Sequence, residues 1–295
     1  MKEKLKKIWM FSGRAVNMLM SLIAILLFSS RRTAKKVRKL NDKKNAEKKA
    51  FVLGNGPSLK KVLATSTLYE ELKNSSIIVT NRFAICDGFF SLRPNYYILL
   101  DPAFFNEETI LGDPSIQNMY EALNRIDWPM SLFISYHAND IVLAKYLHNN
   151  NIKIIRYNDT TIVGSDGFQN YMYHHCLGIP SSRNIVIPAI MMMINLGFGS
   201  IYLYGVEFSW TKNIDVDPNN NKAFLNNSHF YNSKDVLHYE KGWFKWYLEA
   251  IVEMLTGLEK VETFAKSREV KIINRTKGSF IDVFEYENPD NLVKV

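Results

Sequence analysis

From Ala50 onward, short apolar runs alternate with amphipathic stretches, and this alternation constrains the fold more than any other feature of the chain. Short runs bounded by turn residues fit buried strands, and the stretches between them are long enough for crossover helices. The predicted strands are Ala50–Leu53, Ile77–Thr80, Tyr96–Leu100, Ser131–Ser135, Lys153–Arg156, Ile201–Tyr204 and Lys271–Asn274. The sequence therefore predicts a Rossmann-like α/β domain over residues 50–295, with an open, mostly parallel sheet flanked by helices.

Three helices and one long loop can be placed within that domain. One helix begins at Pro57 or Ser58, a second covers Asn184–Leu196, and a third covers about Ser233–Ala265. Before the third helix, residues 211–231 are rich in Asn and Asp and hold few apolar positions. Loops of that length in compact domains are usually functional lids or disordered segments, so we predict a lid-like loop there.

The N-terminal segment predicts contact with a membrane. Residues 9–30 contain one charge, Arg14, and the run Leu19–Phe28 is almost wholly apolar. About 20 helical residues cross a hydrocarbon core of roughly 30 Å, so residues 1–30 are predicted to form a membrane anchor helix. Because Arg14 shortens the uninterrupted run, a re-entrant or interfacial helix remains an alternative. The basic juxtamembrane segment 31–49 places the body in the cytoplasm, and residues 1–50 are expected to bind membrane lipids.

The distribution of charge and cysteine argues against two classes of site. Residues 1–50 contain 15 Lys and Arg against three acidic residues, whereas residues 51–295 contain 22 basic and 26 acidic residues. The net charge of +8 therefore belongs to the N-terminus, and no nucleic acid is expected on the body. Cys86 and Cys176 are too few for a zinc cluster or a disulfide framework, and buried reduced thiols are the expected state.

The strongest local motif is FVLGNGPSLKKV, in which a strand runs into Gly54-Asn55-Gly56 and a helix opens at Pro57-Ser58. Glycines allow a sharp turn and a close approach to a ligand, and free N–H groups at a helix start favour an anion. The pattern is neither the dinucleotide fingerprint nor a Walker loop. Two interpretations remain, a nucleotide site and a tight structural turn.

Polar residues at further strand ends are expected to converge on this turn. Asn81 follows the second predicted strand and Asp101 the third, while Gly205 and Glu207 follow the strand Ile201–Tyr204. The carboxyl ends of strands in an open parallel sheet line its ligand crevice, so we predict that these residues surround a nucleotide together with Gly54, Asn55, Gly56 and Ser58. Each of them alone is an ordinary strand terminator, and Asp101 could serve only to cap a turn.

One histidine and one pair of carboxylates lie in the predicted loop. His229 is flanked by polar residues, and an imidazole with a pKa near 6.5 can accept a proton from an attacking hydroxyl. An isolated surface histidine is the alternative. Asp215-Val-Asp217 matches the D-x-D pattern of metal-dependent glycosyltransferases, but it lies inside a polar loop and is frequent by chance. We therefore predict no metal site.

In combination these residues resemble the bacterial lipooligosaccharide sialyltransferases. That family has a GNGPSL turn, Asn-bearing strand ends, an apolar helix ending in LGY, a strand into SG-I-D-F, and an NSHY segment. The matching segments here agree in order and spacing over residues 51–276, and they are Gly54–Leu59, Thr80–Phe83, Asp101-Pro102, Leu196–Phe198, Tyr204–Phe208 and Asn227–Phe230.

The resemblance implies an inverting, metal-independent transfer of a sialic-acid-like sugar from a CMP-activated donor, with His229 as the base and no cofactor. The implied partners are the nucleotide sugar and a surface glycan or glycolipid, and the implied location is the cytoplasmic face of a bacterial inner membrane. Three positions depart from the family pattern. Asp101 replaces an Asn, Asn184–Val186 replaces Thr-Ser-Gly, and Ser209 or Trp210 replaces a tyrosine that stabilises the leaving phosphate. Tyr231 is a candidate substitute for that tyrosine.

Two other functions remain open on the sequence. The 6-hydroxymethylpterin pyrophosphokinase-like proteins, a related family, also carry a GNGPSL turn and would transfer diphosphate from Mg-ATP. A membrane-tethered, non-catalytic nucleotide-binding protein is the third interpretation. The aromatic-rich stretch around Trp243 and Trp246 could serve a homo-oligomer interface as well as a core.

Overall fold

The computed structural model describes the backbone of residues 2–229, 232–238 and 242–293. It describes the side chains of the same residues except 2–12, 213, 226–229 and 232–238.

The body is built on one eight-stranded sheet, in which every neighbouring pair of strands is parallel. Its order is β11-β10-β6-β1-β2-β3-β4-β5. The strands are β1 (Lys49–Leu53), β2 (Ser76–Thr80), β3 (Tyr96–Leu99), β4 (Met130–Ser135), β5 (Ile152–Tyr157), β6 (Ser200–Tyr204), β10 (Lys271–Asn274) and β11 (Glu285–Tyr286). All seven predicted strands are present, and the open parallel α/β sheet is confirmed. The two-residue β11 was not predicted.

The strand order contains one reversal of direction. From β1 the chain adds β2, β3, β4 and β5 on one side, and then returns to place β6, β10 and β11 on the other. The switch point therefore lies between β1 and β6, which pair in register from Lys49 with Ser200 to Leu53 with Tyr204. Ligand crevices of open α/β sheets form outside the carboxyl ends of strands at such a point.

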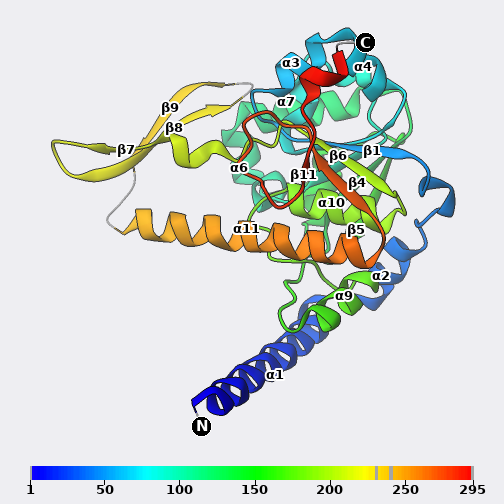
Figure 1. Cartoon of the computed structure of the whole chain (residues 1–295). Coiled ribbons are helices and arrows are strands. Elements are labelled where there is room, and N and C mark those ends of the chain that lie inside the picture. Colours follow the sequence, from blue (N-terminus) through cyan, green and yellow to red (C-terminus); the bar gives the residue numbers. More distant parts are fainter. Residues whose placement is uncertain (1, 230–231, 239–241, 294–295) are drawn as a thin grey trace.

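Helices cover both faces of the sheet (Figure 1). Side chains alternate along β1, so that Ala50 and Val52 enter one apolar core and Phe51 and Leu53 the other. The first core is covered by α2 (Arg31–Arg38), α9 (Asp166–His174), α10 (Val186–Asn195) and α11 (Trp243–Ser267). The second is covered by α3 (Leu59–Ala64), α4 (Ser66–Lys73), α5 (Phe89–Leu92), α6 (Glu107–Gly112), α7 (Pro114–Asn124) and α8 (Asp140–Tyr146).

The predicted loop at 211–231 and the first part of the predicted last helix are wrong. After the short 3-10 helix η4 (Ser209–Asn213), β7 (Ile214–Asp217), β8 (Lys222–His229) and β9 (Asn232–His238) form an antiparallel sheet that projects from the body (Figure 1). The helix α11 begins only at Trp243. Apolar residues alternate with polar ones along β7, and this period of two went unrecognised because the segment is so polar.

The N-terminal helix α1 (Lys2–Phe28) leaves the body as a long rod and is followed, after a bend of 91°, by α2 (Figure 1). Among the described residues, no single helix has both the length and the apolarity of a membrane span, whereas the bent pair Gly13–Phe28 and Arg31–Arg38 meets the test on length and composition. The N-terminal pair is thus only weakly membrane-like.

Candidate functional site

A cavity of about 150 Å³ opens at the switch point, at the carboxyl ends of β1, β2 and β6. Its walls come from the turn after β1, the start of the segment after β2, the start of α10 and the segment after β6. Most of the predicted nucleotide-binding residues lie there, namely Gly54, Asn55, Gly56, Asn81, Gly205 and Glu207, and Ser209 lies with them. The structure therefore brings together residues that are up to 155 positions apart in the sequence.

Two glycines let the turns after β1 and β6 touch. A Cβ on Gly54 would lie 2.3 Å from the carbonyl oxygen of Gly205, and one on Gly56 would lie 1.5 Å from Oε2 of Glu207. The Gly54 N–H donates to the carbonyl of Tyr204 at 2.8 Å, and the Gly56 N–H donates to that of Gly205 at 2.9 Å. The glycines are thus required first for contact between the turns, which then shape the cavity.

Glu207 occupies the position where the sequence predicted an anion. Its Oε1 accepts the backbone N–H of Ser58 at 2.6 Å, immediately before α3. Its own carboxylate therefore takes a free donor at the start of that short helix, in place of a ligand phosphate. The second oxygen, Oε2, is buried and has no hydrogen-bond partner in the protein.

The charge of the cavity favours hydroxyl and amino groups over phosphate. Glu207 is the one charged residue among those that line it, and no Lys or Arg is in that set. A carboxylate accepts hydrogen bonds and repels a phosphate, whereas it attracts the O–H and N–H donors of a ribose, a base or a sugar.

Asn81 supplies a second acceptor. It lies in the left-handed region, with φ of 49°, where Asn is tolerated better than most residues. The backbone carbonyl of Asn81 accepts a hydrogen bond from the Tyr97 hydroxyl. That hydroxyl in turn accepts the Ala84 N–H at 3.1 Å. The Oδ1 atom of Asn81 is buried without a partner in the protein. Asn55 connects the turn after β1 to the end of β2, because its Nδ2 donates to the Thr80 carbonyl at 3.0 Å.

Asp101 is not brought to the cavity. It lies at the N-terminus of the 3-10 helix η3 (Pro102–Phe105), is exposed, and accepts the Ala103 N–H at 2.9 Å. It follows β3, which is two strands from β1 and three from β6. At about 4.8 Å between strands, β3 ends roughly 10 Å from β1 and 14 Å from β6. Its contacts are those of a residue that caps a turn, which was the alternative interpretation of the sequence.

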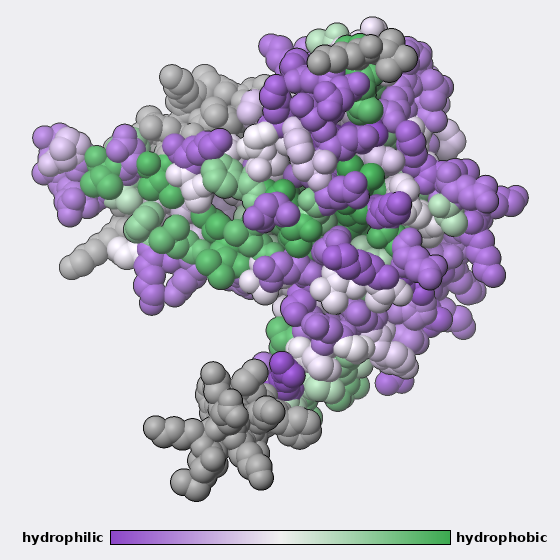
Figure 2. All heavy atoms as spheres, viewed as in Figure 1, coloured by the Kyte–Doolittle hydropathy of each residue, from purple (hydrophilic) through white to green (hydrophobic). Residues whose placement is uncertain are grey.

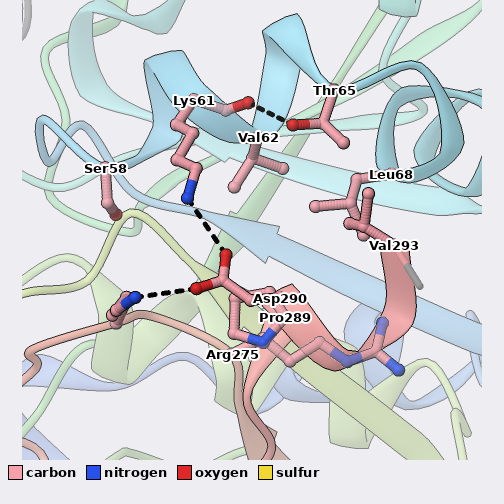
Figure 3. A pocket seen from close by; sticks show the side chains of 10 residues that line it. Ser58, Lys61, Val62, Thr65, Leu68, Arg275, Pro289, Asp290 and Val293 are labelled. Atoms are coloured by element: carbon pink, nitrogen blue, oxygen red, sulfur yellow. Dashed lines mark hydrogen bonds and ion pairs between the residues drawn. The ribbon is translucent and has the colours of Figure 1, made fainter.

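Ser58 faces a second hollow of about 260 Å³ on the other side of the turn (Figure 3). The C-terminal 3-10 helix η5 (Pro289–Val293) forms one wall. Asp290 in that helix binds Lys61 Nζ at 3.0 Å and Lys277 Nζ at 2.7 Å, and these hydrogen bonds lower the pKa of its carboxyl to about 2. Asp290 thus offsets one of the two positive charges, and both lysines are engaged by the chain itself.

The predicted catalytic histidine can be placed only by its backbone. His229 is in β8, in register with Asn232 of β9, and its side chain lies outside the described residues. Tyr231 also lies outside them.

The D-x-D pair has local partners. Asp215 accepts the N–H of Val216 at 2.8 Å, and Asp217 accepts the N–H of Asn219 at 2.9 Å in the turn between β7 and β8. Within the part of the chain that the structure describes, no group of three or more His, Cys, Asp or Glu is placed to hold a metal ion.

Sequence reasoning did not assign three residues of the cavity wall to a site, which are Thr80, Val206 and Phe208. Asn184–Val186 and Trp210 also line it, and the sequence had singled them out only as departures from the sialyltransferase pattern. Trp210 packs against Phe208, with ring centroids 4.9 Å apart and the ring planes tilted by 38°. An aromatic pair just after a strand end is the signal that could have identified this wall.

Comparison with known proteins gives a match at the level of fold. No family model matches the chain, and no curated protein matches it. Among solved structures, the chain is similar to the MAf glycosyltransferase from Magnetospirillum magneticum AMB-1, with a TM-score of 0.52 and 12% sequence identity. The match covers 83% of this chain and 34% of that one, so the chain spans about a third of the glycosyltransferase. The chain therefore has a glycosyltransferase-like fold.

Proposed function

We propose that the chain is a glycosyltransferase whose switch-point cavity holds the hydroxyl-rich part of a nucleotide-activated sugar. The observation that carries this proposal is the pair of partnerless acceptors, Glu207 Oε2 and Asn81 Oδ1, on residues that line one cavity. The similarity in fold to a glycosyltransferase supports the reaction class.

Partnerless acceptors favour a ligand that brings donors. A buried polar atom without a hydrogen bond costs about 1–3 kcal/mol, and a ligand hydroxyl or amino group can remove that cost. Both side chains line the cavity, so a ligand bound there lies beside them. Trp210 adds an aromatic face at the rim, which suits stacking on a base or a sugar ring.

The finer proposal follows the resemblance described above. The donor is a CMP-linked, sialic-acid-like sugar, and transfer is inverting and independent of metal and cofactor. His229 deprotonates the acceptor hydroxyl, and Tyr231 or Ser209 contacts the leaving phosphate. The acceptor is a surface glycan or glycolipid at the cytoplasmic face of a bacterial inner membrane.

A homo-oligomer is a further proposal, supported by the exposed apolar band over α11 and β7 in Figure 2, with Trp246, Val252 and Val216.

A thermal-shift screen of CMP, UDP, GDP and ATP, with and without Mg²⁺, tests the donor class. A ligand at about 100 times its Kd stabilises the folded state by about 2.7 kcal/mol. We expect CMP to raise Tm most, without a requirement for metal. Stabilisation by Mg-ATP alone would instead support the pyrophosphokinase-like alternative, and no shift with any nucleotide would contradict the proposal.

Two variants locate the binding. Glu207→Gln and Asn81→Ala each alter one acceptor, and each should weaken nucleotide binding up to about tenfold, the equivalent of roughly one hydrogen bond. Asp101→Asn is the matched control, because Asp101 is outside the cavity. The nucleotide affinity of this variant should be unchanged.

The role of His229 is tested separately. His229→Ala should abolish sugar transfer while nucleotide affinity stays the same, since a base acts on the acceptor hydroxyl and not on the nucleotide. Unchanged turnover in this variant would remove His229 from the mechanism.

A further inference from the structure

The described half of α1 exposes an apolar surface that the body leaves uncovered. Large apolar side chains are exposed on most of its circumference, with Leu26 at 72% and Leu27 at 68%. The others are Val16, Leu19, Met20, Leu22, Ile23 and Phe28. A continuous exposed apolar surface of this kind marks an interaction site.

One narrow face of the same helix is fixed to the body. Ser21 and Ile25 are buried, and the Ser21 hydroxyl donates to the Val163 carbonyl and accepts the Val163 N–H, both at 2.9 Å. Gly164 has no room for a Cβ, which would lie 2.6 Å from Cγ of Met18. Further along, the Ser29 hydroxyl donates to the Leu177 carbonyl at 2.7 Å. The helix is therefore attached to the body from Met18 to Ser29.

This attachment is incompatible with a span. The body beside Met18 carries polar groups, because Ser165 contacts Met18 and the adjacent Asp166 binds Lys260 at 2.9 Å. Such groups do not enter hydrocarbon, so a crossing helix would have to run through residues 2–17. Charged residues are costly in hydrocarbon, and that stretch holds six of them, Lys2, Glu3, Lys4, Lys6, Lys7 and Arg14.

The arrangement fits a helix that lies in the plane of the membrane. Arg14 is seven residues before Ser21, so it shares the face of the helix that the body covers. Val16, Ile23 and Leu27 repeat at the same helical spacing on the opposite face and are exposed. The one charge of this half therefore lies opposite the exposed Val16, Ile23 and Leu27, as a polar group does in interfacial helices.

A basic cavity lies just beyond this surface. Four cations on and next to α2, together with His175 and Leu177, line a cavity of about 500 Å³, and the cations are Arg31, Lys35, Arg38 and Lys39. None of the four forms an ion pair with a described carboxylate. Arg38 and Arg268 also lower the pKa of the nearby His174, after its desolvation. Uncompensated positive charge beside an apolar surface is complementary to anionic headgroups on a bilayer.

We propose that α1 and α2 form a monotopic docking site for an anionic phospholipid bilayer, in which α1 lies in the interface without crossing it. The apolar face of α1 enters the boundary between headgroups and acyl chains, and the α2 cavity binds lipid phosphates. This inference is independent of the proposed function, because its readouts are membrane binding and topology.

Vesicle co-sedimentation of the full chain tests the docking surface. The protein should bind phosphatidylcholine vesicles that contain phosphatidylglycerol more tightly than vesicles without it. Ile23→Glu combined with Leu27→Glu should abolish binding, whereas Ile141→Glu, a charge placed on an exposed apolar residue of α8, should not. Equal binding by the α1 variant and the control would overturn the proposal. So would a lipid-free dimer that the α1 variant converts to monomers without loss of vesicle binding.

Charge is tested with a second pair of variants. Lys35→Ala combined with Arg38→Ala should weaken binding to the anionic vesicles about 30-fold, at roughly fivefold per cation near the surface. Lys153→Ala combined with Lys222→Ala removes the same charge from exposed positions on the body and should have a much smaller effect. Equal losses of vesicle binding in the two double variants would show that only the net charge matters. That result would contradict a specific role for the α2 cavity.

Labelling distinguishes docking from crossing. Lys4→Cys and, as control, Lys222→Cys are bound to preformed sealed vesicles and treated with a membrane-impermeant maleimide, while the two native thiols remain buried. The proposal predicts that both cysteines are labelled without detergent, because both ends of α1 lie on the outer side. Protection of Lys4→Cys until detergent is added would show a crossing helix and overturn it.

Discussion

The residues that shape the candidate site act mainly on one another. Gly54 and Gly56 leave room for the turn after β6, and Glu207 fills that room and binds the N–H of Ser58. The sequence indicated that this turn was special, but it could not show that the close approach is made by a carboxylate 149 positions away. Long-range contacts of this kind are not encoded in local propensity or periodicity, so the sequence indicated where these turns lie but not that Glu207 would fill the start of the helix.

The contact at Gly56 gives a direct prediction. Gly56→Ala places a methyl group on the Glu207 carboxylate and 2.7 Å from the Gly205 carbonyl oxygen. We expect a loss of roughly 1–3 kcal/mol in the free energy of unfolding, from forced shifts in a packed region. The control is Gly167→Ala in α9, where nothing lies within 4 Å and alanine should be neutral or stabilising. Urea denaturation measures both, and equal stability of the two variants would contradict the contact.

The burial of the two cysteines predicts that neither thiol reacts in the folded protein. Burial raises the pKa of the Cys176 thiol to about 12, and burial also raises that of Cys86. Both groups are therefore protonated and shielded at neutral pH, and thiolate chemistry should be negligible. Ellman's reagent should react with neither thiol in the folded protein and with both after denaturation. Rapid reaction of a native thiol at neutral pH would contradict this burial.

At the scale of elements, the strands of the sheet were predictable and the projecting sheet was not. The run Phe51–Leu53 is apolar throughout because both of its faces are buried, and such runs are visible in a sequence. By contrast, β8 contains Asn226-Asn227-Ser228, which suggests a loop by composition even though the backbone pairs with β9. Pairing between strands depends on a partner segment, and composition alone does not show it.

Arg275 joins several elements of the sheet edge. It follows β10, and its side chain is 4% exposed, with Glu71 of α4 at 2.9 Å and Glu287 at 2.6 Å. Its guanidinium lies 4.0 Å from the ring centroid of Tyr202 in β6. Arg275→Ala should lower the free energy of unfolding by roughly 2–4 kcal/mol, because it removes a buried side chain packed on Tyr202 and leaves Glu287 without its cation. Glu71, by contrast, keeps its ion pair with Lys49 at 2.9 Å.

Two further variants separate this effect from ordinary surface charge. Arg275→Lys keeps the charge but loses the planar fork, so an intermediate loss is expected. Lys245→Ala removes an exposed i,i+4 pair with Glu249 and should change stability by less than about 1 kcal/mol. A loss in Arg275→Ala no larger than that in Lys245→Ala would show that the cluster contributes little.

At the scale of the whole molecule, the strand order decides which polar strand ends meet. The sequence predicted that Gly54, Asn81 and Asp101 would share one crevice, because each follows a strand of the same parallel sheet. The reversal between β1 and β6 instead centres the cavity on Gly54, Asn81 and Glu207, and Asp101 lies too many strands away. Strand order follows from the packing of the complete chain, so the sequence predicted the layer architecture well and the membership of the site only in part.

A structure of the protein with the nucleotide that stabilises it most in the thermal-shift screen tests the central claim most directly. We expect the nucleoside to occupy the cavity between Gly54–Pro57, Asn81 and Glu207, with a ligand hydroxyl or amino group donating to Glu207 or Asn81. A nucleotide bound instead in the hollow beside Lys61 and Lys277, with the switch-point cavity unchanged, would contradict it.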